Sequence, residues 1–140
     1  MMKILISALG IFNLTLSVAF SFVSKEERFA KEMAKYSKTN TFESCISPQQ
    51  IKRTNVLDDN HILFEMRGNK YLLNTLDHKC SRLGFERSIS YTVRGGRLCN
   101  TDTVSVFDNS LGPISSCFLG KFEILEKLPK DSDWNIVLVI

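Results

Sequence analysis

Beyond residue 50, apolar and polar side chains alternate with a period of two in a series of short segments. This alternation is typical of strands that bury one face. It predicts six strands, at residues 50–57, 61–66, 70–75, 85–93, 97–107 and 116–125. Two of the turns between them, Arg67-Gly68-Asn69 and Arg94-Gly95-Gly96, carry residues that tolerate the positive φ of tight hairpins. We therefore expect a mainly β fold, a small antiparallel meander curled into a barrel or a sandwich.

Residues 25–38 follow a helical period instead. Phe29, Met33 and Tyr36 fall at positions i, i+4 and i+7, on one side of a helix. Acidic residues are mixed with the lysines on the polar side, which argues against a helix that binds a membrane surface. We expect one short helix at residues 25–38 and a loop after it at residues 39–47. The helix belongs to a leader at residues 22–44, and the β domain spans residues 45–128.

The first residues have the pattern of a secretory signal peptide. Lys3 precedes an uncharged, apolar stretch at residues 4–24, and small residues suit cleavage after Ala19 or Ser21. Residues 1–21 are therefore expected to be removed on export to an oxidising compartment. The alternative is an uncleaved membrane anchor that keeps residues 4–24, because about 20 uncharged residues are long enough to span a bilayer.

The chain ends in an apolar, strand-like run, Trp134–Ile140, after a polar segment at residues 130–133. An exposed strand of this kind promotes aggregation. We expect residues 129–140 to form a separate tail that pairs with an edge strand or docks on the helix.

Four cysteines, Cys45, Cys80, Cys99 and Cys117, lie beyond the expected signal peptide. An exported protein forms disulfides by default, so two bridges are expected. A structural zinc site needs close cysteine pairs, whereas 17 or more residues separate these neighbours. Three pairings are open, and we favour the nested one, Cys45–Cys117 with Cys80–Cys99.

The composition excludes several classes of function. The chain has 140 residues and a net charge of +3, too little for a typical nucleic-acid binder. It has no hydrolase, zinc-protease, phosphate-loop or dinucleotide motif. Only His61 and His78 could act as a histidine base, with Asp59 or Asp102 as partner, and no nucleophile accompanies them. We expect no catalytic residues, no metal and no cofactor. Asp102 is expected to bond turn amides beside a disulfide, and the alternative is that it binds a ligand.

One segment carries an excess of positive charge. Between residues 79 and 97 five cations face a single acid, Glu86. This segment is predicted either to be simply solvated or to bind an anionic surface. The five cations are Lys79, Arg82, Arg87, Arg94 and Arg97.

An ordered set of short motifs resembles a family of small exported proteins of unknown function from Gram-negative bacteria, mostly proteobacteria. The resemblance covers roughly residues 43–124 and implies a location in the bacterial envelope, but no activity or ligand. The motifs are Cys45 with Ile51, Asp58-Asp59 before Ile62 and Phe64, Tyr71 with Asn74-x-Leu76, Cys80-x-x-Leu83, Leu98-Cys99-x-x-Asp102, and Cys117-x-Leu119-Gly120-x-Phe122.

These features together favour a non-enzymatic, disulfide-linked binding or interaction module of the cell envelope. Its expected partner is an anionic envelope component or another envelope protein, and not nucleic acid. The alternative is a small hydrolase-like envelope enzyme that uses His61 or His78 with Asp59 or Asp102.

Overall fold

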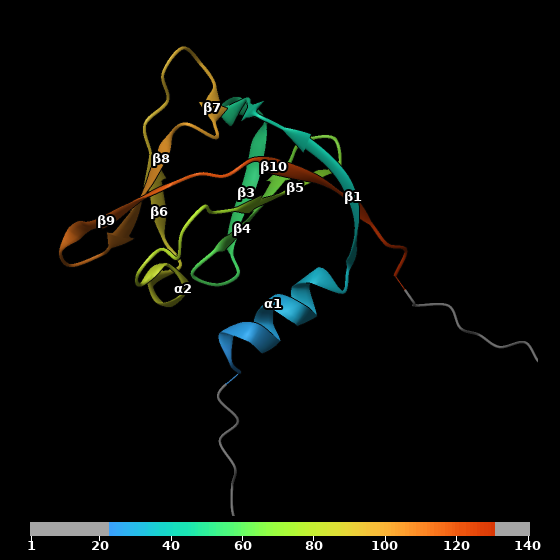
Figure 1. The fold of residues 1–140 in the computed structure, drawn as a ribbon, viewed down its shortest axis with the longest axis horizontal. Coiled ribbons are helices and arrows are strands. Elements are labelled where there is room, and N and C mark those ends of the chain that lie inside the picture. Colours follow the sequence, from blue (N-terminus) through green and yellow to red (C-terminus); the bar gives the residue numbers. More distant parts are fainter. Residues whose placement is uncertain (1–22, 131–140) are drawn as a thin grey trace, which may run out of the picture.

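The computed structural model describes residues 23–130, and these form ten strands, two α-helices and one 3₁₀ turn (Figure 1). The expected cleavage sites and the run Trp134–Ile140 lie outside the described residues. All described strand pairs are antiparallel, which confirms the mainly β prediction. The sheets are arranged like a sandwich and do not close into a barrel.

The main sheet has five strands in the order β1-β10-β5-β4-β3. Its centre is the meander β3–β4–β5, in which each strand pairs with the next along the chain. The last strand, β10, pairs with β5 on one side and with the first strand, β1, on the other. The bounds are β1 (Tyr36–Glu43), β3 (Ile51–Val56), β4 (His61–Met66), β5 (Lys70–Thr75) and β10 (Phe122–Lys127).

A smaller, three-stranded sheet has the order β6-β8-β9, and a two-stranded ribbon pairs β2 with β7. The 3₁₀ turn η1 (Pro48–Gln50) joins β2 to β3, and the short helix α2 follows the chain segment that leaves β5. The bounds are β2 (Cys45–Ile46), α2 (Leu83–Glu86), β6 (Ile89–Tyr91), β7 (Leu98–Cys99), β8 (Thr103–Asp108) and β9 (Gly112–Phe118).

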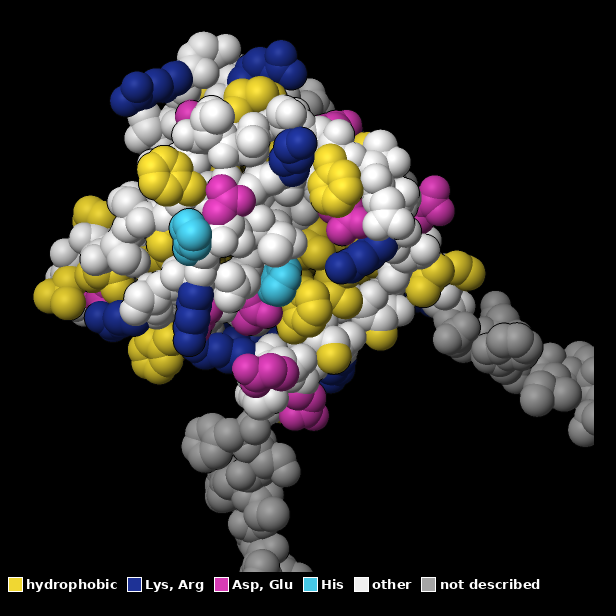
Figure 2. All heavy atoms as spheres, in the orientation of Figure 1, with side chains coloured by type: hydrophobic (Ala, Val, Ile, Leu, Met, Phe, Trp, Pro, Cys, Tyr) yellow, Lys and Arg dark blue, Asp and Glu magenta, His cyan; other side chains and the backbone are white. Residues whose placement is uncertain are grey.

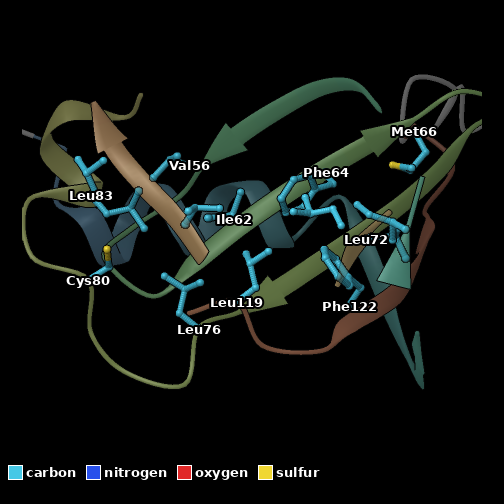
Figure 3. Packing of buried hydrophobic residues seen from close by; sticks show 14 residues of the cluster. Val56, Ile62, Phe64, Met66, Leu72, Leu76, Cys80, Leu83, Leu119 and Phe122 are labelled. Carbon is cyan, nitrogen blue, oxygen red and sulfur yellow. The ribbon is translucent and has the colours of Figure 1, made fainter. Parts of the chain in front are cut away.

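The principal core lies between the two larger sheets (Figure 3). Ile62, Phe64 and Met66 alternate along β4 and face this core, as their spacing predicts. Val104 and Val106 of β8 meet them from the small sheet, and both are fully buried. One apolar face of each sheet is thereby removed from water, which is the main stabilising contribution in a fold of this size.

A second core covers the opposite face of the main sheet. Leu63, Leu73 and Leu125 are buried there under helix α1 (Lys25–Met33). Phe29 and Met33 of that helix pack on them, as the helical spacing predicts. The central strands are therefore covered on both faces, which explains why Glu123 of β10 is buried although alternation assigns it to the polar side.

The disulfides differ from the expected pairing. Cys45 is bonded to Cys99, and Cys80 is bonded to Cys117, so the two bridges interleave along the chain and neither nested bridge forms. Cys45 and Cys99 are directly opposite each other in the β2–β7 ribbon, with their Cα atoms 3.9 Å apart. Strand pairing, which spacing along the chain does not reveal, therefore determines the partners.

The predicted strand at residues 85–93 is mostly wrong. Residues 83–86 form α2, Phe85 is 74% exposed, and only Ile89–Tyr91 is a strand. Arg82 and Arg87 adopt left-handed conformations at the two ends of α2. The burial of Leu83 and the attachment of Cys80 hold this segment in a tight turn, and these tertiary contacts override the local alternation.

Two further predicted strands are each divided in two. The segment at residues 97–107 breaks at residues 100–102, where Asp102 returns to accept a hydrogen bond from the amide of Cys99. The segment at residues 116–125 breaks at residues 119–121, where the chain leaves the small sheet as β9 and enters the main sheet as β10. A strand that changes sheets keeps its alternation, so the pattern does not show the break.

Strand β1 lies where a helical leader and a loop were expected. Its polar sequence and mainly exposed positions give no two-residue alternation. Asn40 has a φ of 56°, and the register with β10 shifts between Lys38 and Phe42, which is typical of a bulge at a sheet edge. The β fold therefore begins at residue 36 rather than at residue 45.

A buried amide fixes the point where the chain enters the main sheet. The side chain of Asn74 donates to the carbonyl of Gly120 at 2.6 Å and accepts from its amide at 2.9 Å. A Cβ atom on Gly120 would lie 1.9 Å from the carbonyl oxygen of Thr75, so only glycine fits there. Asn74 thus supplies the hydrogen bonds that an adjacent strand would otherwise provide.

We predict that Asn74→Ala lowers the free energy of unfolding by about 2–3 kcal/mol, because it leaves two buried backbone groups of Gly120 without partners. Urea unfolding monitored by circular dichroism measures this loss. Asn109→Ala, at an exposed turn, is the control and should change stability by less than about 0.5 kcal/mol. Equal stabilities of Asn74→Ala and the parent would contradict the assigned role.

Candidate functional site

The five cations predicted as one group lie in two separate places. Lys79, Arg82 and Arg87 surround α2, whereas Arg94 and Arg97 lie at the tip of the loop between β6 and β7, at the top of Figure 1. Figure 2 shows the basic side chains spread over the visible face and interspersed with acids. The prediction of a single cationic hairpin is therefore wrong, because α2 interrupts the expected strand.

The cations near α2 are partly neutralised. Arg82 forms an ion pair with Glu86 and lies 3.6 Å from the carboxylate of Asp108. Lys79 lies 3.8 Å from the carboxylate of Asp59. These pairs offset the charges of Lys79 and Arg82. Arg87 is exposed and forms no ion pair within the described residues, so this end of the molecule presents one unpaired cation of the group rather than two and is the weaker candidate for anion binding.

The β6–β7 tip has the opposite character. Arg94 and Arg97 face each other across Gly95 and Gly96, whose φ angles of 63° and 72° define a tight turn that favours glycine. Both arginines are exposed, and within residues 23–130 neither guanidinium makes a hydrogen bond or an ion pair. The tip thus presents two free positive charges on the same side of one hairpin.

A small hollow of about 280 Å³ lies beside this tip. Its walls combine hydroxyl groups with one cation and one anion. The residues that line it are Thr92, Arg94, Thr101, Asp102 and Thr103. Asp102 accepts a hydrogen bond from the amide of Cys99 at 2.6 Å, which confirms its expected place next to a disulfide and anchors the base of the loop.

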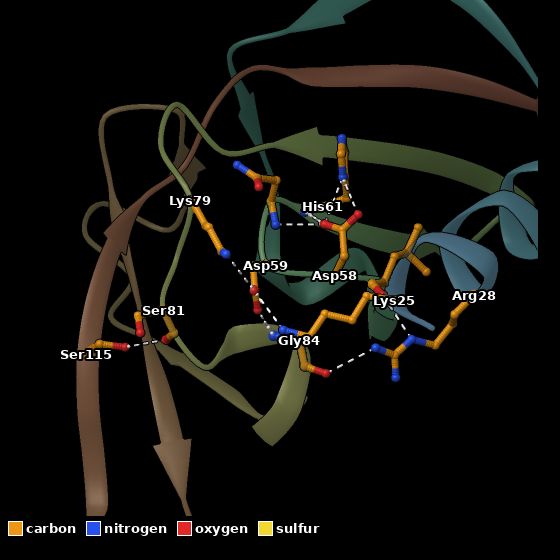
Figure 4. Close-up of polar contacts among 11 residues, drawn as sticks. Lys25, Arg28, Asp58, Asp59, His61, Lys79, Ser81, Gly84 and Ser115 are labelled. Carbon is orange, nitrogen blue, oxygen red and sulfur yellow. Dashed lines mark hydrogen bonds and ion pairs between the residues drawn. The ribbon is translucent and has the colours of Figure 1, made fainter. Parts of the chain in front are cut away.

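Two of the catalytic candidates, Asp59 and His61, lie elsewhere, around the turn between β3 and β4 (Figure 4). Asp58 accepts hydrogen bonds from the amides of Asn60 and His61, at 2.7 and 2.8 Å. Its carboxylate also lies 2.8 Å from Nδ1 of His61, and the imidazole stacks on Phe29 with ring centroids 4.3 Å apart. His61 is therefore held by Asp58, a residue that the enzyme hypothesis does not name, and not by Asp59 or Asp102.

Asp59 links three parts of the fold. It accepts a hydrogen bond from the amide of Gly84 at 2.8 Å and one from the Lys25 ammonium at 2.8 Å. Burial alone would raise the pKa of Asp59, but these two hydrogen bonds and the charges of Lys25 and Lys79 outweigh it and lower the pKa below its usual range. Both carboxylate oxygens are thereby occupied in joining α1, the β3–β4 turn and α2.

A second contact from α1 reinforces the same junction. The Arg28 side chain donates to the carbonyl of Leu57 at 3.0 Å and to that of Gly84 at 3.1 Å (Figure 4). A Cβ atom on Gly84 would lie 2.9 Å from the Asp59 carboxylate, so this approach also depends on glycine. The acidic turn is a structural junction between the helix and the sheets.

The remaining candidates do not join this cluster. His78 is exposed in the segment that follows β5, and Asp102 lies at the base of the β6–β7 loop. Among residues 23–130 no group of three or more potential metal ligands is close enough to hold an ion. Within residues 23–130 neither histidine forms a hydrogen bond or an ion pair with Asp59 or Asp102, the partners that the enzyme hypothesis names.

The fold and its crosslinks define the class of the molecule, a disulfide-linked, mainly antiparallel β protein with one helix packed on its main sheet. No helix within residues 23–130 has the length and apolar character needed to cross a membrane. The chain belongs to a family of unknown function (DUF6491), whose model matches residues 1–126. No curated protein matches the chain, and no solved structure matches it.

We predict that the contribution of Asp59 to stability depends on pH. Its pKa is depressed in the folded state, so its contribution is present above the pKa of the unfolded chain, about 3.9, and is lost as the pH falls through the folded value. Asp59→Asn should therefore lower stability by about 1–2 kcal/mol at pH 7, with the difference from the parent shrinking below about pH 4.

Urea unfolding of both proteins at pH 7, 5 and 3 measures this difference. The exposed Asp77, changed to Asn, is the matched control and should leave stability nearly unchanged at every pH. A loss in Asp59→Asn that stays constant from pH 7 to pH 3 would contradict the ionic role of the Asp59 carboxylate.

Proposed function

We propose that this protein is a non-enzymatic binding module of the bacterial envelope that holds an anionic envelope component at the β6–β7 tip. The observation that carries this proposal is the pair of free guanidinium groups of Arg94 and Arg97, presented together on one tight turn. Guanidinium groups bind carboxylate and phosphate through paired hydrogen bonds. The base of the loop is anchored by Asp102 and by the Cys45–Cys99 bridge.

The proposed compartment rests on the chemistry of the cysteines and on the N-terminal sequence. All four cysteines are paired, and such bridges persist in oxidising compartments such as the periplasm. Lys3 and the apolar stretch at residues 4–24 have the pattern of a signal peptide, cleaved after Ala19 or Ser21. An anchor that retains residues 4–24 is the alternative, and it leads to the same side of the inner membrane.

The enzyme alternative has weaker support. A histidine base must reach a nucleophile or a water site in a pocket. The Nδ1 atom of His61 is held by Asp58 and its ring lies on Phe29, while the carboxylate of Asp59 is occupied by Lys25 and a backbone amide. Hydrogen bonds and packing within the fold thus engage the side chains of His61 and Asp59, whereas within the described residues no such contact engages the guanidinium groups of Arg94 and Arg97.

We predict that the double variant Arg94→Ser/Arg97→Ser binds isolated bacterial envelope about tenfold more weakly than the parent at low salt, because it loses two charge-assisted contacts. Binding of the parent should fall as salt rises, since screening shortens the reach of exposed charges to about 8 Å at physiological ionic strength. Co-sedimentation of the purified protein with envelope fragments, at low and high salt, measures both effects.

Lys52→Ser/Arg53→Ser on β3 is the matched control, because it removes the same charge from another exposed pair of neighbouring residues. Both double variants should keep their stability within about 0.5 kcal/mol of the parent, as is usual for surface changes. The proposal fails if the tip variant binds envelope as well as the control variant does at each salt concentration.

A further inference from the structure

The hollow beside the β6–β7 tip contains both a free donor and a free acceptor. The guanidinium of Arg94 makes no hydrogen bond or ion pair within the described residues. Only one carboxylate oxygen of Asp102 is engaged, by the amide of Cys99, and the other has no partner there. Because Arg94 and Asp102 line the same hollow without pairing, a ligand in it would meet one donor and one acceptor at once.

An exposed aromatic ring lies next to this hollow. Phe118 of β9 is 60% exposed and is directly opposite Thr103, which lines the hollow. Opposed residues of antiparallel strands project from the same face, so the phenyl ring flanks the hydroxyl of Thr103 on the outer side of the small sheet. The exposed phenyl ring offers an apolar surface on which a ligand seated in the hollow can pack.

This combination fits one class of ligand. A sugar ring carries hydroxyl groups for a carboxylate and for threonine hydroxyls, and an apolar C–H face that packs on an aromatic ring. A bare anion would be repelled by Asp102, and a neutral sugar would leave the two arginines unused. The hollow of about 280 Å³ lies just below the roughly 300–1,000 Å³ of most small-molecule pockets, so it suits a single ring.

We propose that the hollow is a binding site for an acidic sugar residue, a pyranose that bears a carboxylate or a phosphate. The acid group is held by Arg94, which lines the hollow, and by Arg97, which lies opposite Arg94 on the turn beside it. Ring hydroxyls donate to the free oxygen of Asp102 and bond Thr101 and Thr103, and the ring packs on Phe118. This inference rests on the proposed function and specifies the chemistry of the envelope component that the tip recognises.

Titration of the ¹⁵N-labelled, oxidised protein, followed by amide chemical shifts, tests the proposal with small probes. Glucuronate and glucose 6-phosphate distinguish a carboxylate from a phosphate as the acid group, glucose lacks the acid, and inorganic phosphate lacks the ring. We expect at least one acidic sugar to shift the amides of residues 92–103 in a saturable manner, at concentrations where glucose and phosphate do not.

Two variants then separate a sugar site from a simple anion site. Asp102→Asn keeps an acceptor for the Cys99 amide and loses the charge, and Phe118→Ala removes the ring. Each should weaken binding of the acidic sugar by roughly tenfold, the loss expected from one good contact. Phe85→Ala is the control, because Phe85 is 74% exposed on α2, away from the hollow, and it should bind as the parent does.

The outcomes distinguish this inference from the proposed function. If inorganic phosphate shifts the same amides as strongly as the acidic sugars, or if both variants bind them like the parent, the sugar site is wrong. Loss of envelope binding in Arg94→Ser/Arg97→Ser together with that result would leave the anion-binding function standing without the sugar. Unchanged envelope binding in the double variant would instead remove the proposed function.

Discussion

Two interleaved disulfides constrain the two smaller β elements of the fold, the β2–β7 ribbon and the three-stranded sheet. The β2–β7 ribbon has two strands and the small sheet has three. An isolated two-stranded ribbon is marginally stable in water, and three strands are about the minimum for an independently stable sheet. Cys45–Cys99 joins the two strands of the ribbon, and Cys80–Cys117 joins the segment after β5 to β9. They close chain segments with sequence separations of 54 and 37, and in the loop-entropy model each closure contributes roughly 4 kcal/mol.

The remaining junctions are held by short polar side chains that bond the backbone. Asp58 caps the β3–β4 turn, Asp59 receives the amide of Gly84, and Asp102 receives that of Cys99. Asn74 does the same for Gly120 at the point where the chain changes sheets. In a fold with many strand breaks, each break leaves backbone groups without partners, and these side chains satisfy them. Asp59 and Asp102, the two acids that the enzyme hypothesis names, therefore bond backbone amides at such breaks.

The β6–β7 tip holds two cations close together that form no ion pair in the part of the chain that the structure describes. The acids near α2 pair with Arg82 and Lys79, whereas Arg94 and Arg97 face each other across one turn, and Arg94 lines the hollow with Asp102 without bonding to it. The ribbon that carries the tip is crosslinked at Cys99, immediately beyond it. A binding loop on a crosslinked base loses less conformational entropy on binding than a free loop does.

Local patterns predicted the parts of the fold that local interactions determine. The strands β4 and β5 and the turn between them match their predicted bounds, because alternation and the positive φ of Gly68 and Asn69 act within a few residues. Helix α1 and the role of Asp102 were predicted on the same basis.

The predictions fail where contacts between residues far apart in the sequence determine the local structure. The bridge from Cys80 to Cys117 and the contact of Asp59 with Gly84 hold residues 83–86 in a helical turn despite their alternation, and so divide the expected cationic segment. The cysteine pairing follows from the pairing of β2 with β7, two short strands without a pattern of their own. The exposed Phe118 and the hollow beside it depend on register between strands, which one sequence does not reveal.

The most direct test of this account is the disulfide connectivity of the purified, oxidised protein. Digestion with trypsin and chymotrypsin without reduction, followed by mass spectrometry, separates the four cysteines, because cleavage after Phe107 parts Cys99 from Cys117. The account predicts linked peptides that contain Cys45 with Cys99 and Cys80 with Cys117. Peptides that join Cys45 to Cys117 and Cys80 to Cys99, or four free thiols, would contradict it.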